Sequence, residues 1–336
     1  MKGLLTSSVA RYCITLAVLW AVAAPAAWMF LNAQQVPQWL AVTFTVAVLV
    51  EASLYLLPGF FSQLPVEEGC GPRAAWGLPA CLTVSAVVPY LIYALLAGVF
   101  SWSSLGLLAA LAAVIAFWYV VLPRRSWADL LFLAFVAAVT LSNVFRQVIP
   151  TLNPRAPGEI LGRLMWIRMG IATMLWMRRI AGTGFGFIPS AREWKIGVLY
   201  YAGFLPVAFL LNLCLGFARL RAWPPVYPLR TVALAVGVFF GMLWVVALSE
   251  EFFFRGLLQR WIGEWTGRPF LALALTSVVF GAAHVTFPPG FPNWKFVILA
   301  TGAGFFYGRA AQVGGGIRAA MVTHALVNVT WRTFFM

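Results

Sequence analysis

Long apolar runs, separated by short polar or charged segments, repeat along the whole chain. Runs of about 20 apolar residues are long enough to cross a bilayer as helices. We therefore expect an all-α, polytopic transmembrane helix bundle of about ten spans. The predicted segments are 12–32, 39–61, 75–100, 105–122, 129–145, 160–177, 196–217, 231–258, 270–285, 295–311 and 317–335.

Two of these segments contain ionisable residues that need an explanation. Segment 160–177 carries Arg163 and Arg168 within its apolar run. A helix of this kind can lie in the membrane interface instead of spanning the bilayer. Glu51 stands alone in the second segment. Since an ionisable group inside a membrane usually has a partner or a function, we expect Glu51 either to pair with a distant arginine or to be protonated.

The composition supports a membrane protein and argues against a nucleic-acid partner. Hydrophobic residues make up 62% of the 336 residues and charged residues only 10%, whereas soluble domains carry about 25% charge. The net charge is +14, but the Lys and Arg residues stand singly or in pairs between apolar runs. Basic loops on the inner side of a membrane explain such charge. We expect the lipid bilayer as a partner and no nucleic acid.

The chain divides by content into two parts. Residues 1–190 are predicted to form N-terminal transmembrane helices of unknown role, with almost no candidate chemistry. Residues 191–336 hold the interpretable polar clusters, all of them between 250 and 328. The two parts show no internal repeat, which a transporter would be expected to have.

Two adjacent glutamates, Glu250 and Glu251, stand at the end of an apolar run and are followed by Arg255. Glu251 and Arg255 have the four-residue spacing of a helical ion pair, whereas Glu250 points about 100° away around the helix. One carboxylate can therefore be neutralised while the other stays free to act as a general base. A helix end that is neutralised by its own charges at the membrane surface would explain the same residues equally well.

Both histidines of the chain lie in later apolar segments. His284 ends the segment 270–285, where a single histidine is more often an interfacial group than a catalyst. His324 and Asn328 are four residues apart and share one helix face, which must point into the bundle or into a water-filled cavity. Hydrogen bonding between helices is the simpler explanation of that pair. The concentration of scarce polar groups in one region nevertheless favours a common site.

Taken in order, these elements resemble the motifs of the CPBP family, which holds the type II CAAX-prenyl endopeptidases and the bacterial bacteriocin-processing and self-immunity proteins. The motifs are Glu250-Glu251-x-x-x-Arg255, Phe280-x-x-x-His284 and His324-x-x-x-Asn328. Flanking residues agree as well, namely Phe254-Arg255-Gly256-Leu257-Leu258-Gln259, Gly304-x-x-x-Gly308 and Thr323-His324-Ala325. The resemblance covers residues 230–336 and implies an intramembrane protease (a hydrolase), by analogy in a bacterial inner membrane.

The resemblance also implies a role for each matched residue. Glu250, with His284, would activate a water for attack on a peptide bond of a membrane-associated peptide or protein. His324 and Asn328 would form an oxyanion hole. Arg255 would hold Glu251 in place, and no cofactor is needed. The implied catalytic residues are Glu250, Glu251, Arg255, His284, His324 and Asn328.

Two alternatives remain open from the sequence. Two histidines and one glutamate, here His284, His324 and either Glu250 or Glu251, can hold zinc with one open position for water. The chain lacks the H-E-x-x-H signature, and Asn328 would have no role, so the metal-free reading is favoured. The other alternative is a non-catalytic membrane scaffold or immunity protein of the same fold, which would have no need for the complete polar set.

Overall fold

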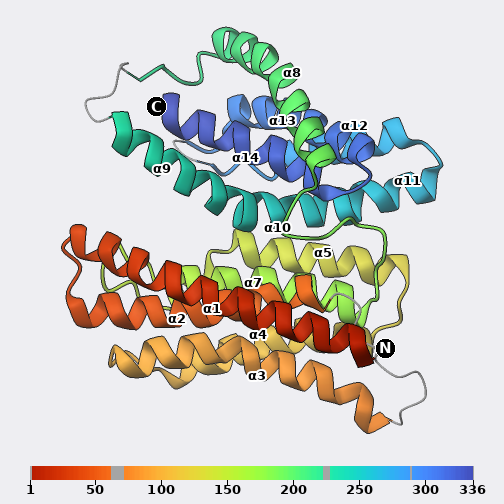
Figure 1. The fold of residues 1–336 in the computed structure, drawn as a ribbon. Coiled ribbons are helices and arrows are strands. Elements are labelled where there is room, and N and C mark those ends of the chain that lie inside the picture. Colours follow the sequence, from red (N-terminus) through yellow and green to blue (C-terminus); the bar gives the residue numbers. More distant parts are fainter. Residues whose placement is uncertain (1, 62–71, 222–227, 288–289, 336) are drawn as a thin grey trace. The chain divides into compact units, whose positions relative to one another are not determined.

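The chain is helical and forms no strand in the residues that the computed structural model describes, 2–61, 72–221, 228–287 and 290–335. Seven of the described helices are long and apolar enough to cross a membrane, and Ser126–Leu141 and Pro269–Ala282 are shorter apolar helices. The predicted all-α, polytopic transmembrane fold is thereby confirmed. The helices pack into two compact units, residues 1–181 and 182–336 (Figure 1).

The first unit is built around helix α7. Helices α2, α3, α4, α5 and α6 all pack against α7, which is mostly buried. The elements of this unit are α1 (Lys2–Ala33), α2 (Gln38–Phe60), α3 (Pro72–Leu96), α4 (Trp102–Val121), α5 (Ser126–Leu141), α6 (Val144–Val148), α7 (Glu159–Ala172) and the π-helix η1 (Thr173–Met177).

The placement of α7 corrects one prediction. An interfacial position for segment 160–177 is wrong, because α7 and η1 together form a buried helix of membrane-spanning length. The guanidinium of Arg168 donates to both carboxylate oxygens of Glu51, at 2.8 and 3.1 Å, and to the Ser85 hydroxyl at 2.9 Å. This pair explains both the arginine and the lone glutamate, since a buried charge persists only with a bonded partner.

The second unit contains one long helical rod and four further helices. The rod runs through α9 (Pro228–Gly241), the π-helix η2 (Met242–Ala247), α10 (Leu248–Glu251), the π-helix η3 (Phe252–Gln259) and α11 (Arg260–Thr266). It therefore continues beyond the predicted segment 231–258. The other helices are α8 (Ala191–Leu215), α12 (Pro269–Ala282), α13 (Trp294–Gly314) and α14 (Ile317–Phe334).

Helix α14 lies at the centre of the second unit. It packs against α8, α9, η2, α10, η3 and α13 (Figure 1). Glycines allow these close approaches, as small residues do in membrane helix bundles. A Cβ on Gly197 of α8 would lie 2.6 Å from Val322 Cγ1, and one on Gly308 of α13 would lie 2.5 Å from Gln259 Oε1. Gly308 therefore serves close packing of α13 against the rod.

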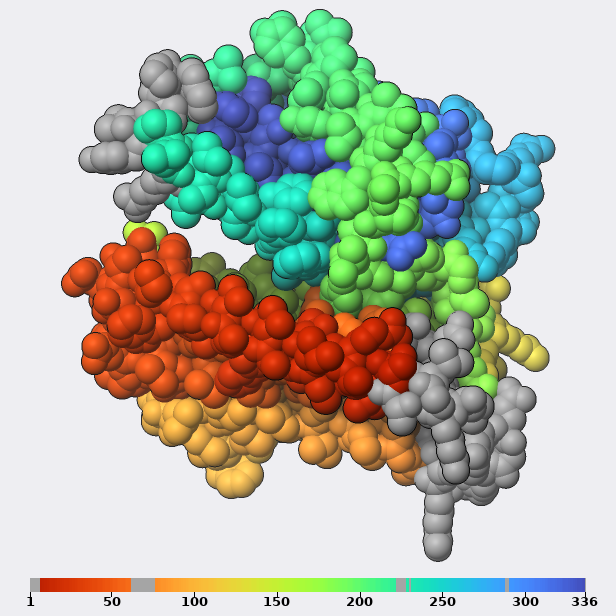
Figure 2. Space-filling view, viewed as in Figure 1, coloured from red at the N-terminus to blue at the C-terminus, as the bar shows by residue number. Residues whose placement is uncertain are grey.

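Helices α1 and α8 leave most of their apolar surface uncovered within their units. Few residues of either helix are buried, and both lie on the visible face of the space-filling view, α1 in red and α8 in green (Figure 2). Isolated apolar side chains are common on soluble surfaces, but whole apolar helices are not. The acyl chains of a bilayer are the natural cover for such helices.

Candidate active site

Glu251 and Arg255 form the buried centre of the motif region. Arg255 Nη1 lies 3.2 Å from Glu251 Oε1, and both side chains are fully enclosed. Arg255 Nη2 also donates to the Gly304 carbonyl at 2.9 Å, and its guanidinium carbon lies 4.4 Å from the centre of the Phe280 ring. The predicted helical ion pair is confirmed, and its cation is held from three sides.

His324 completes this arrangement from the neighbouring helix α14. Its Nδ1 lies 2.7 Å from Glu251 Oε1, the same oxygen that binds Arg255. Its ring stacks on Tyr307 with centroids 4.5 Å apart and meets the Phe280 ring edge-on at 5.9 Å. A carboxylate that is paired with arginine can only accept, so Nδ1 carries the proton. The imidazole therefore has a fixed position and a fixed orientation.

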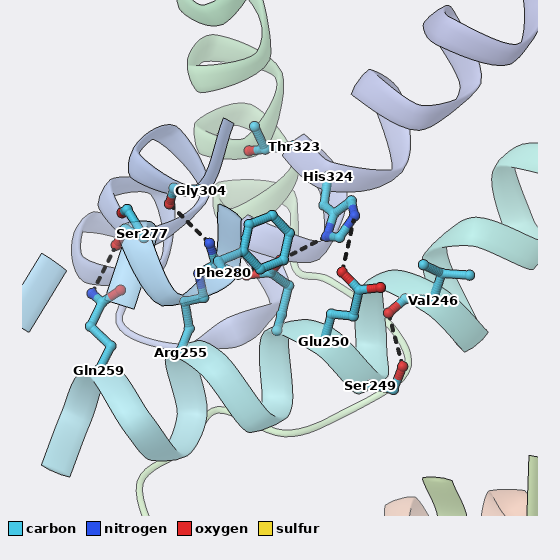
Figure 3. Close-up of polar contacts among 12 residues, drawn as sticks. Val246, Ser249, Glu250, Arg255, Gln259, Ser277, Phe280, Gly304, Thr323 and His324 are labelled. Atoms are coloured by element: carbon cyan, nitrogen blue, oxygen red, sulfur yellow. Dashed lines mark hydrogen bonds and ion pairs between the residues drawn. The ribbon is translucent and has the colours of Figure 1, made fainter. Parts of the chain in front are cut away.

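Glu250 differs from its neighbour in both exposure and bonding. Its side chain keeps 31% of its surface exposed, and its Oε2 lies 3.8 Å from His324 Nε2, which is too long for a hydrogen bond. In Figure 3 the Glu250 carboxylate points toward the His324 ring. Two adjacent carboxylates thus have separate environments, one neutralised within the protein and one accessible from outside.

His284 and Asn328 lie at the border of this cluster. His284 follows the end of α12 and is half-buried, with Nδ1 2.8 Å from the Phe280 carbonyl and its ring 4.8 Å from the Phe280 ring. Asn328 Nδ2 lies 3.7 Å from the Met242 sulfur of η2. Phe280 is the side chain that contacts both histidine rings. The structure places His324, not His284, as the imidazole beside Glu250.

The side chains of this region are not arranged as a metal site. Among the described residues, no three His, Cys, Asp or Glu side chains are placed so that they could hold a metal ion. His284 and His324 each use Nδ1 for a bond within the protein, to the Phe280 carbonyl and to Glu251 respectively.

The backbone around the two glutamates is unusual. The single α-helical turn α10 lies between two π-helical stretches, η2 and η3. Such wide turns are rare and occur frequently at functional sites. These π-helical turns were not predicted from the sequence, because the helix-face assignments assumed a regular α-helix. Prolines and glycine pairs, the usual causes of helix distortion, do not occur between Met242 and Gln259.

Three supporting residues were also missed as parts of the site. Tyr307 stacks on His324, and no sequence signal distinguishes it from other aromatic residues of α13. Gln259 donates to the Gly308 carbonyl at 3.3 Å, four residues after Arg255 bonds to Gly304. Thr323 Oγ1 donates to the Gly197 carbonyl at 3.0 Å and ties α14 to α8 next to His324. Gln259, Gly304, Gly308 and Thr323 were visible as motif neighbours, but their partners were not.

The fold and the site together define a polytopic helical membrane protein with a buried Glu–Arg–His cluster. Residues 232–330 match the family model of the type II CAAX prenyl endopeptidase Rce1-like proteins. The resemblance read from the motifs is thereby confirmed for this C-terminal region. The match supports, in general terms, a membrane protease that acts on a peptide or protein substrate.

Similarity beyond the family model is limited to a short segment. A protein of Bacillus subtilis (strain 168), described as uncharacterized protein YpbD, is 28% identical over 87 residues, which are 26% of this chain and 40% of that protein. The chain therefore matches less than half of that relative. No solved structure matches the chain.

Proposed function

We propose that the chain is an intramembrane endopeptidase in which Glu250 is the general base, and that it acts in a bacterial inner membrane. One observation carries the proposal. Glu251 is already held by Arg255 and His324. Glu250 beside it is partly exposed, and its buried oxygen Oε2 accepts no hydrogen bond from the described residues. Of the two carboxylates, only Glu250 is placed to take a proton from a water that also meets a substrate.

The proposed reaction is hydrolysis of one peptide bond. Glu250 takes a proton from water while the water oxygen bonds to the peptide carbonyl carbon. The negative charge that develops on the carbonyl oxygen is stabilised by donors from His324 Nε2 and Asn328 Nδ2. The proton then passes from Glu250 to the leaving nitrogen, the C–N bond breaks, and a carboxylic acid and an amine are released.

The contacts of the polar side chains support these roles. The Asn328 amide nitrogen donates to the Met242 sulfur, a weak acceptor, so a substrate oxygen can replace that sulfur at small cost. His324 donates its Nδ1 proton to Glu251, and its Nε2 donates as well when the ring is doubly protonated. The Phe280 carbonyl fixes the proton on His284 Nδ1, which leaves Nε2 of the neutral ring as an acceptor for water.

A cleavage assay on the purified, detergent-solubilised protein tests the proposal. A peptide library is incubated with the unchanged protein, with Glu250→Ala, and with the unchanged protein plus a chelator. Cleavage that is lost in Glu250→Ala and survives chelation supports the proposal. Loss in both arms indicates a metal enzyme. Unchanged cleavage by Glu250→Ala overturns the role of Glu250, and equal complementation of a deletion strain by both forms indicates a non-catalytic protein.

A further inference from the structure

A polar pocket lies in the second unit, at the end where α13 turns into α14. Its volume is about 290 Å³, and its polar side chains are Thr183, Arg255, Gln259, Arg260 and Gln312. Its rim includes the exposed residues Gly182, Pro269 and Gly315, and its floor includes the buried residues Arg255, Gln259 and Ala272. The pocket thus leads from the outside of the unit to Arg255, the cation of the Glu251–Arg255 pair.

Two atoms on the floor of this pocket have no hydrogen-bond partner among the described residues. They are Arg255 Nε and Gln259 Oε1, on side chains that are 4% and 6% exposed. One of these atoms donates and the other accepts. Leaving such groups unpaired costs about 1–3 kcal/mol each, and water is the small molecule that can satisfy both. At about 30 Å³ per water molecule, the pocket has room for several.

A row of similar atoms continues from the pocket to Glu250. Gln259, Arg255 and Glu251 follow one another at four-residue intervals along the rod, and Glu250 adjoins Glu251. Glu251 Oε2 and Glu250 Oε2 are also buried without a partner. Four buried polar atoms thus occur on neighbouring turns of the rod, two of them at the pocket floor, one on Glu251 and the last on the candidate base Glu250 itself.

We propose that this pocket is a water-filled inlet, and that the row of polar atoms behind it delivers the hydrolytic water to Glu250. The inlet stands on the geometry of the pocket alone, whereas the delivery of hydrolytic water rests on the proposed function. Peptide hydrolysis consumes one water per bond, and Glu251 and Arg255 on the inner side of Glu250 are enclosed by other helices. The inlet also hydrates Arg255 from the side facing away from His324.

Thiol labelling tests the inlet without any assay of activity. The four native cysteines are replaced by serine, and Ala272→Cys or Ala311→Cys is introduced in the pocket wall. The protein in lipid vesicles is treated with methanethiosulfonate ethylammonium, a small cationic reagent that reacts with thiolates in water. The control is Ala300→Cys, a buried position of α13 outside the pocket. Labelling of either pocket position about tenfold faster than the control is expected; rates equal to the control overturn the inlet.

Filling the pocket tests the delivery of water. A Cβ on Gly263 would lie 3.7 Å from Ala272 Cβ, an ordinary contact, so Gly263→Leu extends into the pocket. Gly237→Leu is the control, because no atom lies within 4 Å of its Cβ. For folded protein, Gly263→Leu is expected to slow labelling at Ala311→Cys and to lower kcat about tenfold with KM unchanged.

The two parts of the inference can fail separately. An unchanged kcat in Gly263→Leu together with slowed labelling overturns the delivery route and retains the inlet. An unchanged protein that cleaves no substrate and complements no better than Glu250→Ala overturns the proposed function and, with it, the delivery route. In that case the labelling rates still decide whether water fills the pocket.

Discussion

The carboxylate of Glu251 accepts a hydrogen bond from His324 Nδ1 at 2.7 Å across the interface between the rod and α14. The same oxygen binds Arg255, so one atom joins two helices and a cation. A carboxylate oxygen that binds both partners is suited to hold them in position. In the proposed function the chemistry is assigned to the adjacent Glu250, and the two glutamates should therefore respond differently to mutation.

Glu250→Gln is expected to lower peptide hydrolysis by about 10²–10⁴-fold, the usual contribution of a general base. The unfolding temperature should change little, because the side chain is partly exposed and its Oε2 makes no hydrogen bond. Cleavage assays and thermal unfolding in detergent measure the two effects. Glu264→Gln, on the same rod with 52% of its side chain exposed, is the control and should match the unchanged protein. Full activity in Glu250→Gln would contradict the assignment.

Glu251→Gln is expected to reduce both stability and activity. The substitution leaves the Arg255 charge buried without a counter-ion, which typically costs about 3–5 kcal/mol. Chemical denaturation in mixed micelles measures the loss. The double variant Glu251→Gln with Arg255→Met removes the unpaired charge and should be more stable than the single variant. If the single variant were as stable as the unchanged protein, the ion pair would have no structural role.

Substitutions of Glu51 and Arg168 in the first unit should also have non-additive effects on the free energy of unfolding. Either Glu51→Gln or Arg168→Met alone leaves one buried charge without a partner, at a cost of about 3–5 kcal/mol. The double variant should lose less than the sum of the two single variants, as residues in direct contact do. A double-mutant cycle by chemical denaturation measures this coupling. Simple additivity would mean that the two charges do not interact in the membrane.

Gly308→Ala is expected to destabilise the second unit by about 1–3 kcal/mol, because the added methyl group meets Leu273 and Gln259. Gly237→Ala adds the same group where no atom lies within 4 Å. That control should gain up to about 1 kcal/mol from better helix propensity. Thermal unfolding of the two variants provides the comparison. Equal shifts would show that the contact between α13 and the rod is looser than described.

Local spacing predicted the parts of this protein that depend on one helix. The apolar runs predicted the helices, and the four-residue spacing predicted the bond between Glu251 and Arg255. The C-terminal limit of the rod was missed, because the charges from Arg255 to Glu264 indicate a membrane surface, whereas in the structure Arg255 is enclosed by other helices.

Contacts between distant segments were beyond the sequence. Arg168 bonds to a glutamate 117 positions earlier, and His324 bonds to one 73 positions earlier. No periodicity in a single chain specifies such pairs, because they depend on which helices become neighbours. The resemblance to a known family gathered the polar residues into one candidate site, but the three-dimensional arrangement was needed to show that His324 and not His284 adjoins Glu250.

The hydrogen bonds from Arg255 to Gly304 and from Gln259 to Gly308 fix the register between η3 and α13 at two points. Sliding the rod by one residue along α13 would break both bonds. It would also press side chains against Gly304 and Gly308, beside which there is no room for another side chain. The position of Glu250 along the helix axis, relative to α13, can therefore change only by whole residues and not continuously. Under the proposed function, a substrate whose cleavable bond lies a full helical turn, about 5.4 Å, too shallow or too deep would miss Glu250. This fixed register would then select substrates by length.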